Sequence, residues 1–131
     1  MGWAGFQELY KRKDRFDIRI LARDSKKNRK KLAPYLSDPS VTVVWGDLMR
    51  YADVLEGVKG SDYVLHVGGM VSPAADYYPE KTLKVNVGSA ENVVKAVLAQ
   101  PDASEIRVVY IGSVAQYGDR NPPHHWGSAD D

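Results

Sequence analysis

Apolar residues along this chain follow two alternating periods, one typical of amphipathic helices and one typical of buried strands. The first helical face carries Trp3, Phe6, Leu9 and Tyr10. Short runs rich in β-branched and aromatic residues, which predict strands, occupy 16–22, 41–45, 63–67 and 107–111. Further helical patterns occupy 26–36, 48–58 and 80–99. The predicted order is therefore a helix followed by a strand, repeated four times.

Helices that alternate with continuous apolar strands indicate a parallel sheet covered on both faces. Right-handed crossovers make such a sheet doubly wound, which gives a Rossmann-like α/β fold. The 131 residues fit one domain, with 1–112 as the sheet-and-helix core and 113–131, rich in Gly, Pro and His, as a loop region. Doubly wound sheets bind ligands at the carboxyl ends of their strands, so the residues that follow each strand form the candidate site.

The segment after the first strand combines an arginine with an acidic neighbour, Arg23-Asp24. A dinucleotide fold meets the adenosine ribose at this position, where an acid favours a free 2′-hydroxyl and an arginine accommodates a 2′-phosphate. Arg23 is nearest the strand and can donate two hydrogen bonds to phosphate, which favours NADP(H) over NAD(H). Asp24 is a competing signal for a ribose hydroxyl. The other basic residues of 26–31 fit a solvated helix face equally well.

The other three strand ends carry small or polar residues. Asp47 fits either an N-cap of the next helix or an acceptor for the amino group of adenine. Gly68 and Gly69 would let the backbone approach a ligand closely, although a tight turn uses the same residues. Ser113 can hydrogen-bond a substrate carbonyl or hydroxyl, and serine is also a common turn former.

Composition and charge narrow the range of partners. The formal net charge of +1 gives no electrostatic reason to expect nucleic acid or a membrane surface. The absence of cysteine excludes disulfides and thiolate catalysis and suits a cytoplasmic protein. No apolar run approaches the length of a membrane span. His124 and His125 are adjacent and diverge, and His66 fits a hydrogen-bonded core residue, so we expect no metal site.

Several short motifs follow one another in a characteristic order. They are D-Y-V-L-H-V-G-G at 62–69, N-V-G-S at 86–89 with Asn92-Val93, and V-Y-I-G-S-V-A-Q-Y-G at 109–118, preceded by Gly46-Asp47-Leu48. Together they resemble the extended short-chain dehydrogenases, which form the NAD-dependent epimerase/dehydratase family. The resemblance covers essentially the whole chain.

The resemblance implies a dinucleotide cofactor and hydride chemistry on a small molecule such as a sugar nucleotide. Ser113 would polarise the substrate oxygen beside a catalytic tyrosine. Asn86 resembles the helix asparagine that supports the active site of relatives, and a purely structural role is the alternative. The implied cofactor contacts are Gly2, as the last glycine of a phosphate-binding loop, together with Arg23, Asp47, Leu48, Gly68 and Gly69.

The chain also departs from the family pattern. The family begins with a strand and a glycine-rich loop that binds pyrophosphate, and it carries Y-x-x-x-K after the serine. This chain begins at Met1, and neither Tyr117 nor an earlier tyrosine has a lysine four residues later in the required place. We therefore expect a partial domain, truncated at both ends and inactive as an isolated chain. In the strand order 3-2-1-4-5 the missing strand is the central one, so its two neighbours would expose unpaired backbone groups.

Unpaired strand edges predict one of three outcomes. The chain rearranges its strand pairing, assembles with another copy as a homo-oligomer or by strand swapping, or is a piece of a longer protein. For function, the first hypothesis is an NAD(P)-dependent epimerase/dehydratase or reductase. The second is a non-catalytic dinucleotide-binding or regulatory module of the same fold. An unrelated doubly wound domain is a third alternative.

Overall fold

The structure is a computed structural model, and it describes residues 1–113. Its elements are α1 (Gly2–Tyr10), β1 (Ile18–Ala22), α2 (Lys26–Leu32), the 3₁₀ turn η1 (Ala33–Tyr35), β2 (Val41–Trp45), α3 (Tyr51–Val58), β3 (Tyr63–His66), α4 (Ala74–Tyr77), α5 (Pro79–Leu98) and β4 (Arg107–Tyr110). This order confirms the predicted alternation of helices and strands. The short helix α4 is an addition that the sequence pattern did not predict.

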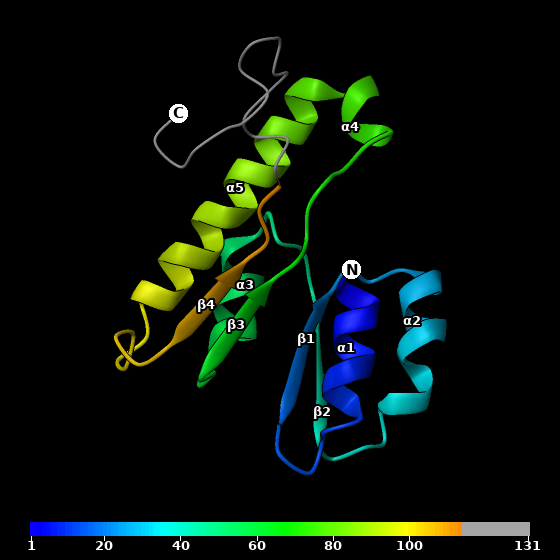
Figure 1. The fold of residues 1–131 in the computed structure, drawn as a ribbon, viewed down its shortest axis with the longest axis vertical. Coiled ribbons are helices and arrows are strands. Elements are labelled where there is room, and N and C mark those ends of the chain that lie inside the picture. The colour runs from blue at the N-terminus through cyan, green and yellow to red at the C-terminus, as the bar shows by residue number, and fades with distance from the viewer. Residues whose placement is uncertain (114–131) are drawn as a thin grey trace, which may run out of the picture.

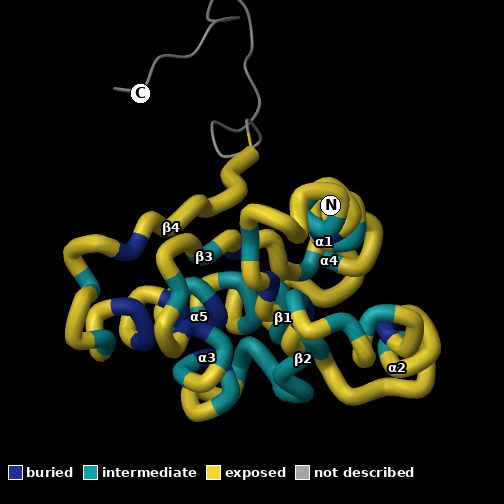
Figure 2. Tube along the Cα trace, turned by 90° about the horizontal axis from the view of Figure 1, so that it is seen from below, coloured by how far each residue is buried: buried dark blue, intermediate teal, exposed yellow. Residues whose placement is uncertain are grey.

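The four strands form two separate parallel pairs. The β1–β2 pair runs in register from Ile18 opposite Val41 to Ala22 opposite Trp45. The β3–β4 pair runs from Tyr63 opposite Arg107 to His66 opposite Tyr110. Figures 1 and 2 show the strands in the spatial order β2, β1, β3, β4, with β1 and β3 as the facing edges. The Rossmann-like arrangement is therefore present, but residues 1–113 supply no strand that joins the pairs.

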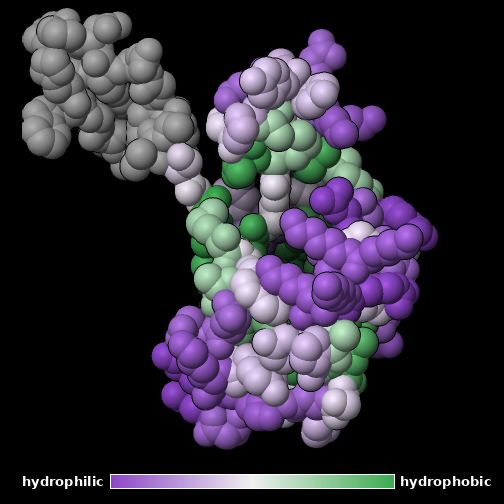
Figure 3. All heavy atoms as spheres, turned by 90° about the vertical axis from the view of Figure 1, so that its right-hand side faces the viewer, coloured by the Kyte–Doolittle hydropathy of each residue, from purple (hydrophilic) through white to green (hydrophobic). Residues whose placement is uncertain are grey.

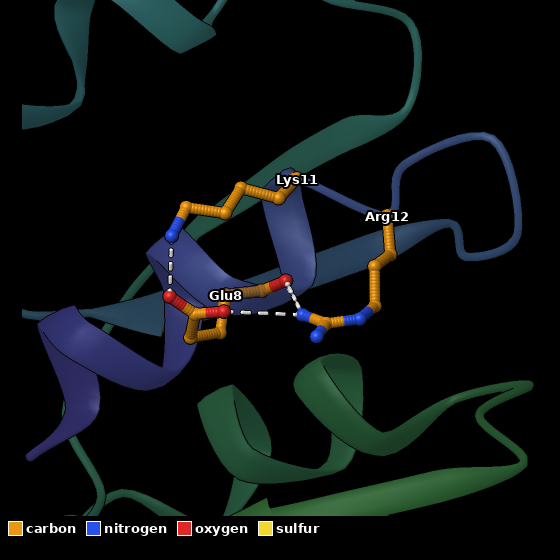
Figure 4. A network of polar contacts seen from close by, with 3 residues as sticks. All are labelled: Glu8, Lys11 and Arg12. Atoms are coloured by element: carbon orange, nitrogen blue, oxygen red, sulfur yellow. Dashed lines mark hydrogen bonds and ion pairs between the residues drawn. The ribbon is translucent and has the colours of Figure 1, made fainter.

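The first core cluster lies between α1 and the β1–β2 pair and is built on aromatic rings. Phe6 is buried with Ile18 and Val41. The ring of Tyr35 meets those of Phe6 and Tyr10 edge-on, with centroids 4.8 Å apart in each pair. At the end of α1, the Glu8 carboxylate accepts hydrogen bonds from Lys11 at 2.6 Å and Arg12 at 3.2 Å (Figure 4). The face that carries α1 and α2 is largely hydrophilic in Figure 3.

The second core cluster is aliphatic and lies between α3, α5 and the strand β4. Its buried members are Val54, Val58, Val93, Ala96, Val97 and Ile106. Leu21 of β1 packs against the same cluster, so α3 is where the two strand pairs share contacts. The residues of β4 itself are exposed along its whole length (Figure 2).

Two predicted helices are shorter than their apolar patterns suggested. The helix predicted over 26–36 ends as α2 at Leu32 and continues as η1, because Pro34 has no N–H to extend the α-helical ladder. The helix predicted over 48–58 begins only at Tyr51. The residues before it are held in a turn by Asp47, whose Oδ1 accepts a hydrogen bond from the Met49 amide at 2.9 Å.

Candidate functional site

The loop after β1 is organised by side-chain hydrogen bonds. Ser25 caps α2 by accepting a hydrogen bond from the Asn28 amide at 3.1 Å. The Asn28 side chain in turn donates to the Arg23 carbonyl at 2.7 Å. The Arg23 side chain is exposed, and within residues 1–113 its guanidinium makes no hydrogen bond or ion pair. The backbone of Arg23 is thus fixed while its charge remains available to an anion.

Asp24, the competing ribose-binding candidate, is already paired. Arg29 donates from Nε to Asp24 Oδ1 at 2.5 Å and from Nη2 to Oδ2 at 2.8 Å. The hydrogen bond from Arg29 holds the pKa of Asp24 below its ordinary value. The same guanidinium lies over the ring of Trp45 at the end of β2, 4.8 Å from its centroid. Arg29 is one of the basic residues of 26–31 that fit a solvated helix face equally well by sequence, and no local pattern pointed to Trp45.

The loop after β2 touches the end of β1. The Gly46 amide donates to the Ala22 carbonyl at 3.0 Å. A Cβ on Gly46 would lie 2.5 Å from the Cβ of Asp53, so this position requires glycine. Asp53 accepts the amide hydrogen of Asp47 at 2.9 Å. Asp47 therefore stabilises the turn that precedes α3, which is close to the capping alternative, although the helix itself begins four residues later.

The two glycines after β3 have packing reasons of their own. A Cβ on Gly68 would lie 2.4 Å from Leu48 Cδ1. The absence of a side chain at Gly68 therefore lets the loops after β2 and β3 pack closely. A Cβ on Gly69 would lie 3.0 Å from the side-chain oxygen of Asn86. The missing side chains thus make room for protein atoms. The expected close approach of a cofactor to this backbone stays a prediction.

Two asparagine side chains of α5 hydrogen-bond the backbone of the loops after β2 and β3. Asn86 accepts from the Met70 amide at 2.7 Å and donates to the Met70 carbonyl at 3.0 Å. Two turns further on, Asn92 donates to the Leu48 carbonyl at 2.8 Å. Ser89 lies between them, is fully buried and hydrogen-bonds the Asn86 carbonyl at 3.2 Å. The geometry favours the structural alternative for Asn86, because its amide is engaged with the backbone of one loop residue.

His66 is buried at 6% exposure, in agreement with the prediction of a core histidine. Its Nε2 lies 3.5 Å from Ser89 Oγ, and its ring stacks on Tyr110 with centroids 5.7 Å apart. Burial lowers the pKa of His66 below its ordinary value. No group of three or more His, Asp or Glu side chains within residues 1–113 could hold a metal ion.

The remaining predicted residues lie at the periphery of this edge. Gly2 begins α1 beside the end of β3, where an added Cβ would lie 3.2 Å from Val67 Cγ2. Ser113 is exposed and follows β4 by three residues. Tyr117, Trp126 and the pair His124-His125 lie outside the described residues.

The spacing of Y-x-x-x-K does occur once in the sequence, at Tyr77 and Lys81. It precedes β4, whereas the family places the motif after the serine. Tyr77 is 77% exposed on α4, and Lys81 Nζ lies 6.0 Å from the ring centroid of its neighbour Tyr78. This pair is therefore not positioned by the core that holds the strand ends.

The fold and the strand-end loops define a chain of the Rossmann-like α/β class, with polar residues gathered at the carboxyl edge of parallel strands. A family model described as "NAD dependent epimerase/dehydratase family" matches residues 3–130. The chain belongs to this family, as the motifs predicted. No helix within residues 1–113 is long and apolar enough to cross a membrane.

Individual relatives agree with the family match. The chain is 35% identical over 83 residues to a UDP-glucose 4-epimerase of Rickettsia akari, which covers 63% of this chain and 24% of that protein. It is 36% identical over 83 residues to the UDP-glucose 4-epimerase of Rickettsia canadensis, with the same coverage. The chain thus spans about a quarter of the length of the curated relatives it matches. A solved structure of Pen from Bacillus thuringiensis shares the fold, with a TM-score of 0.56, 24% identity, and coverage of 62% of this chain and 26% of that chain.

Proposed function

We propose that this chain forms the adenosine-binding side of an NAD(P)-dependent enzyme that acts on a sugar nucleotide. Family membership and the resemblance to UDP-glucose 4-epimerases support this class of substrate. The nicotinamide group of the cofactor would supply hydride transfer, and Ser113 would hydrogen-bond the substrate oxygen. The observation that carries the proposal is the exposed Arg23 guanidinium at the carboxyl end of β1, beside the loop after β2.

The described residues fit the adenosine end of a dinucleotide. Arg23 offers a charge with no protein partner within residues 1–113, and Trp45 offers a partly exposed ring one strand away. Arg29 already neutralises Asp24 through two hydrogen bonds. An acidic residue that is paired in this way repels a 2′-phosphate less, which supports NADP(H) over NAD(H).

Nucleotide titration of the chain tests this assignment. We expect Arg23→Ala to weaken NADP(H) binding by roughly tenfold to a hundredfold, the effect of about 1.5–3 kcal/mol from a hydrogen bond to a charged group, and to leave NAD(H) nearly unchanged. Lys30→Ala is the matched control, because it removes one exposed cation from α2 on the same loop-helix unit. Equal losses for both nucleotides would remove the role of Arg23. The absence of saturable binding of either nucleotide would contradict the proposed function.

A second candidate is a dinucleotide-binding module without turnover. One observation favours it: the side-chain amide of Asn86 is engaged with the backbone of Met70 through both its oxygen and its nitrogen. An assay with UDP-glucose and NAD⁺ or NADP⁺ separates the candidates. We expect nucleotide binding without formation of UDP-galactose, and any turnover above background would contradict this second proposal.

Self-association belongs to the proposals as well. The facing edges of β1 and β3 carry backbone groups without a strand partner within residues 1–113, which supports a homo-oligomer or strand-swapped assembly. Deuterium exchange of the β1 and β3 amides at increasing protein concentration tests edge pairing. Protection that does not change with concentration would contradict it.

A further inference from the structure

The formal net charge of +1 conceals an uneven distribution of charge along the chain. Residues 1–45 carry 11 Lys and Arg against 5 Asp and Glu, which gives +6. Residues 46–131 carry 7 Lys and Arg against 12 Asp and Glu, which gives −5. A chain with this asymmetry takes a preferred orientation at a charged surface, although its net charge alone favours no such partner.

The excess of positive charge is concentrated on α2. This helix carries four exposed lysines, and Leu32 is its buried residue. At 3.6 residues per turn the lysines project from the side of the helix opposite Leu32. Figures 1 and 2 show α2 on the side of the molecule that lies away from α5 and β4. We call the residues Lys26, Lys27, Lys30 and Lys31 the α2 lysine face.

The α2 lysine face differs from the basic residues at the end of α1. There Lys11 and Arg12 donate to the Glu8 carboxylate, and Lys13 donates to Asp38 at 2.5 Å. Within residues 1–113, the four lysines of α2 form no ion pair with a carboxylate. Their charge is therefore available to an external partner.

The positions of these lysines also oppose the stability of the helix. The first turn of α2 has no acidic residue, and Lys26 and Lys27 lie close to the partial positive charge of the helix N-terminus. Lys30 and Lys31 follow them at a spacing of four residues, which places like charges side by side. Such a conflict between local sequence and local structure is typical of functional surfaces in natural proteins.

We propose that the α2 lysine face docks this chain on an anionic lipid surface. The inference is independent of the proposed function, because Arg23 and the strand-end loops are not part of this face. Several cations on one helix face bind acidic lipid headgroups, and each exposed lysine increases partitioning by about fivefold. The four lysines together supply an increase on the order of several hundredfold. The negative charge of residues 46–131 is repelled by the same surface, so the chain would dock with α2 towards the lipid.

A lipid surface fits this face better than single-stranded nucleic acid does. Proteins that bind single strands stack the bases on free aromatic rings. The two tryptophans beside α2 already have a cation over their rings. Lys31 Nζ lies 4.0 Å from the ring centroid of Trp3, and the Arg29 guanidinium lies 4.8 Å from that of Trp45. Flexible lysine side chains, by contrast, reach the headgroups of a lipid surface as separate point charges.

Co-sedimentation of the full chain with lipid vesicles tests the proposal. We expect saturable binding to vesicles of phosphatidylcholine and phosphatidylglycerol in equal parts, and no binding to phosphatidylcholine alone. Lys27→Ala/Lys30→Ala should lower the partition coefficient by roughly twentyfold to thirtyfold, whereas Lys27→Arg/Lys30→Arg should retain binding because it keeps both charges.

The matched control is Lys84→Ala/Lys95→Ala, which removes two exposed lysines from α5 and changes the net charge by the same amount. It should lower the partition coefficient by less than about twofold, since charges beyond a Debye length from the lipid are screened. Equal losses in the two alanine variants would show that binding follows net charge alone, and they overturn the proposal.

Salt and stability measurements separate docking from folding. Raising the salt concentration from about 0.1 M to about 1 M shortens the Debye length from about 10 Å to about 3 Å, so vesicle binding should be lost. Thermal unfolding of Lys27→Ala/Lys30→Ala should occur at the same temperature as in the unmodified chain or higher, because alanine is the better helix former and like charges are removed. A marked loss of stability in this variant, or binding to single-stranded DNA without binding to the vesicles, overturns the proposal.

Discussion

The two strand pairs of this protein pack against cores of different composition, one aromatic and one aliphatic. The N-terminal unit (residues 1–45) packs aromatic rings of α1 and η1 against β1 and β2, and polar side chains of its loops pair with one another. The C-terminal unit (residues 51–113) packs short aliphatic side chains, and partly buried amide side chains of α5 hold the loops after β2 and β3. The N-terminal unit pairs the charged side chains of its loops on the surface, and the C-terminal unit buries the polar residues His66 and Ser89.

This difference indicates that the two units have separate roles at the shared edge. The N-terminal unit presents Arg23 and the Asp24–Arg29 pair to solvent, where they can meet an anion. The C-terminal unit positions backbone, since Asn86 and Asn92 fix the loops at Met70 and Leu48. In the proposed function, recognition by charge and rigidity of the loops therefore come from different halves of the chain.

The largest expected effect tests whether the units unfold separately. Phe6→Ala should cost about 3–5 kcal/mol, because it leaves a cavity among Tyr10, Tyr35 and Ile18. Val54→Ala, its counterpart in the C-terminal unit, should cost roughly 2 kcal/mol for two methyl groups and a smaller cavity. Denaturant titration measures both losses.

Hydrogen exchange then locates each loss. In Phe6→Ala we expect the amides of β1 and β2 to lose protection while those of α5 keep more of theirs, because the two buried clusters share no residue. Equal loss of protection across both units would show that they unfold as one cooperative body, coupled through α3, and would contradict separate unfolding.

A medium effect concerns the two asparagines of α5. Asn86→Leu should cost about 1–3 kcal/mol, because it leaves both the N–H and the C=O of Met70 without their partner. Asn92→Leu should cost about 1 kcal/mol, since only the Leu48 carbonyl loses a hydrogen bond. Thermal unfolding of the two matched variants measures the difference. If Asn92→Leu were less stable than Asn86→Leu, the expected order of the two losses would be wrong.

Part of this architecture could be predicted from sequence. The strands were identified because β-branched runs such as 41–45 have no helical period, and the amphipathic pattern of α5 extends over 20 residues. The helix α4 was missed because it has only four residues, 74–77, and they carry no apolar period. Boundaries moved where local chemistry outweighed the pattern, at Pro34 and at the turn held by Asp47.

The site was predicted less completely than the fold. Arg23, Asp24 and Asp47 could be predicted because they follow parallel strands, and topology alone places such residues at the carboxyl edge of the sheet. The bond from Asn92 to Leu48 joins residues 44 positions apart, so no local spacing could reveal it. The pairing of Asp24 with Arg29 depends on the turn capped by Ser25, and the stacking of Arg29 on Trp45 depends on the register of β1 with β2.

Acidification should weaken the two units in sequence. Burial lowers the pKa of His66 in the folded chain, so the unfolded chain binds the proton more readily. Stability is therefore complete above the unfolded value of about 6.5 and decreases as the pH falls below it. In the N-terminal unit, hydrogen bonds from Lys13 and Tyr10 lower the pKa of Asp38 from 3.8 to about 2, so its contribution is lost only as the pH falls through that range.

Unfolding followed from pH 8 to pH 2 by residue-resolved exchange checks this order. We expect the amides around His66 to lose protection first and those around Tyr10 last. His66→Gln should remove the first step and leave the second. A first step that persists in His66→Gln would assign the loss to another group.

The smallest expected effect on stability is at the Asp24–Arg29 pair, and it sharpens the distinction between recognition and rigidity. Both side chains are more than half exposed, so Asp24→Asn should leave the free energy of unfolding nearly unchanged despite the two short hydrogen bonds. The same substitution frees the charge of Arg29 beside Arg23, so NADP(H) binding should strengthen while NAD(H) binding does not. A clear loss of stability, comparable to that of a core substitution, would show that this pair holds the N-terminal unit together, and the recognition role of the edge would then rest on Arg23 alone.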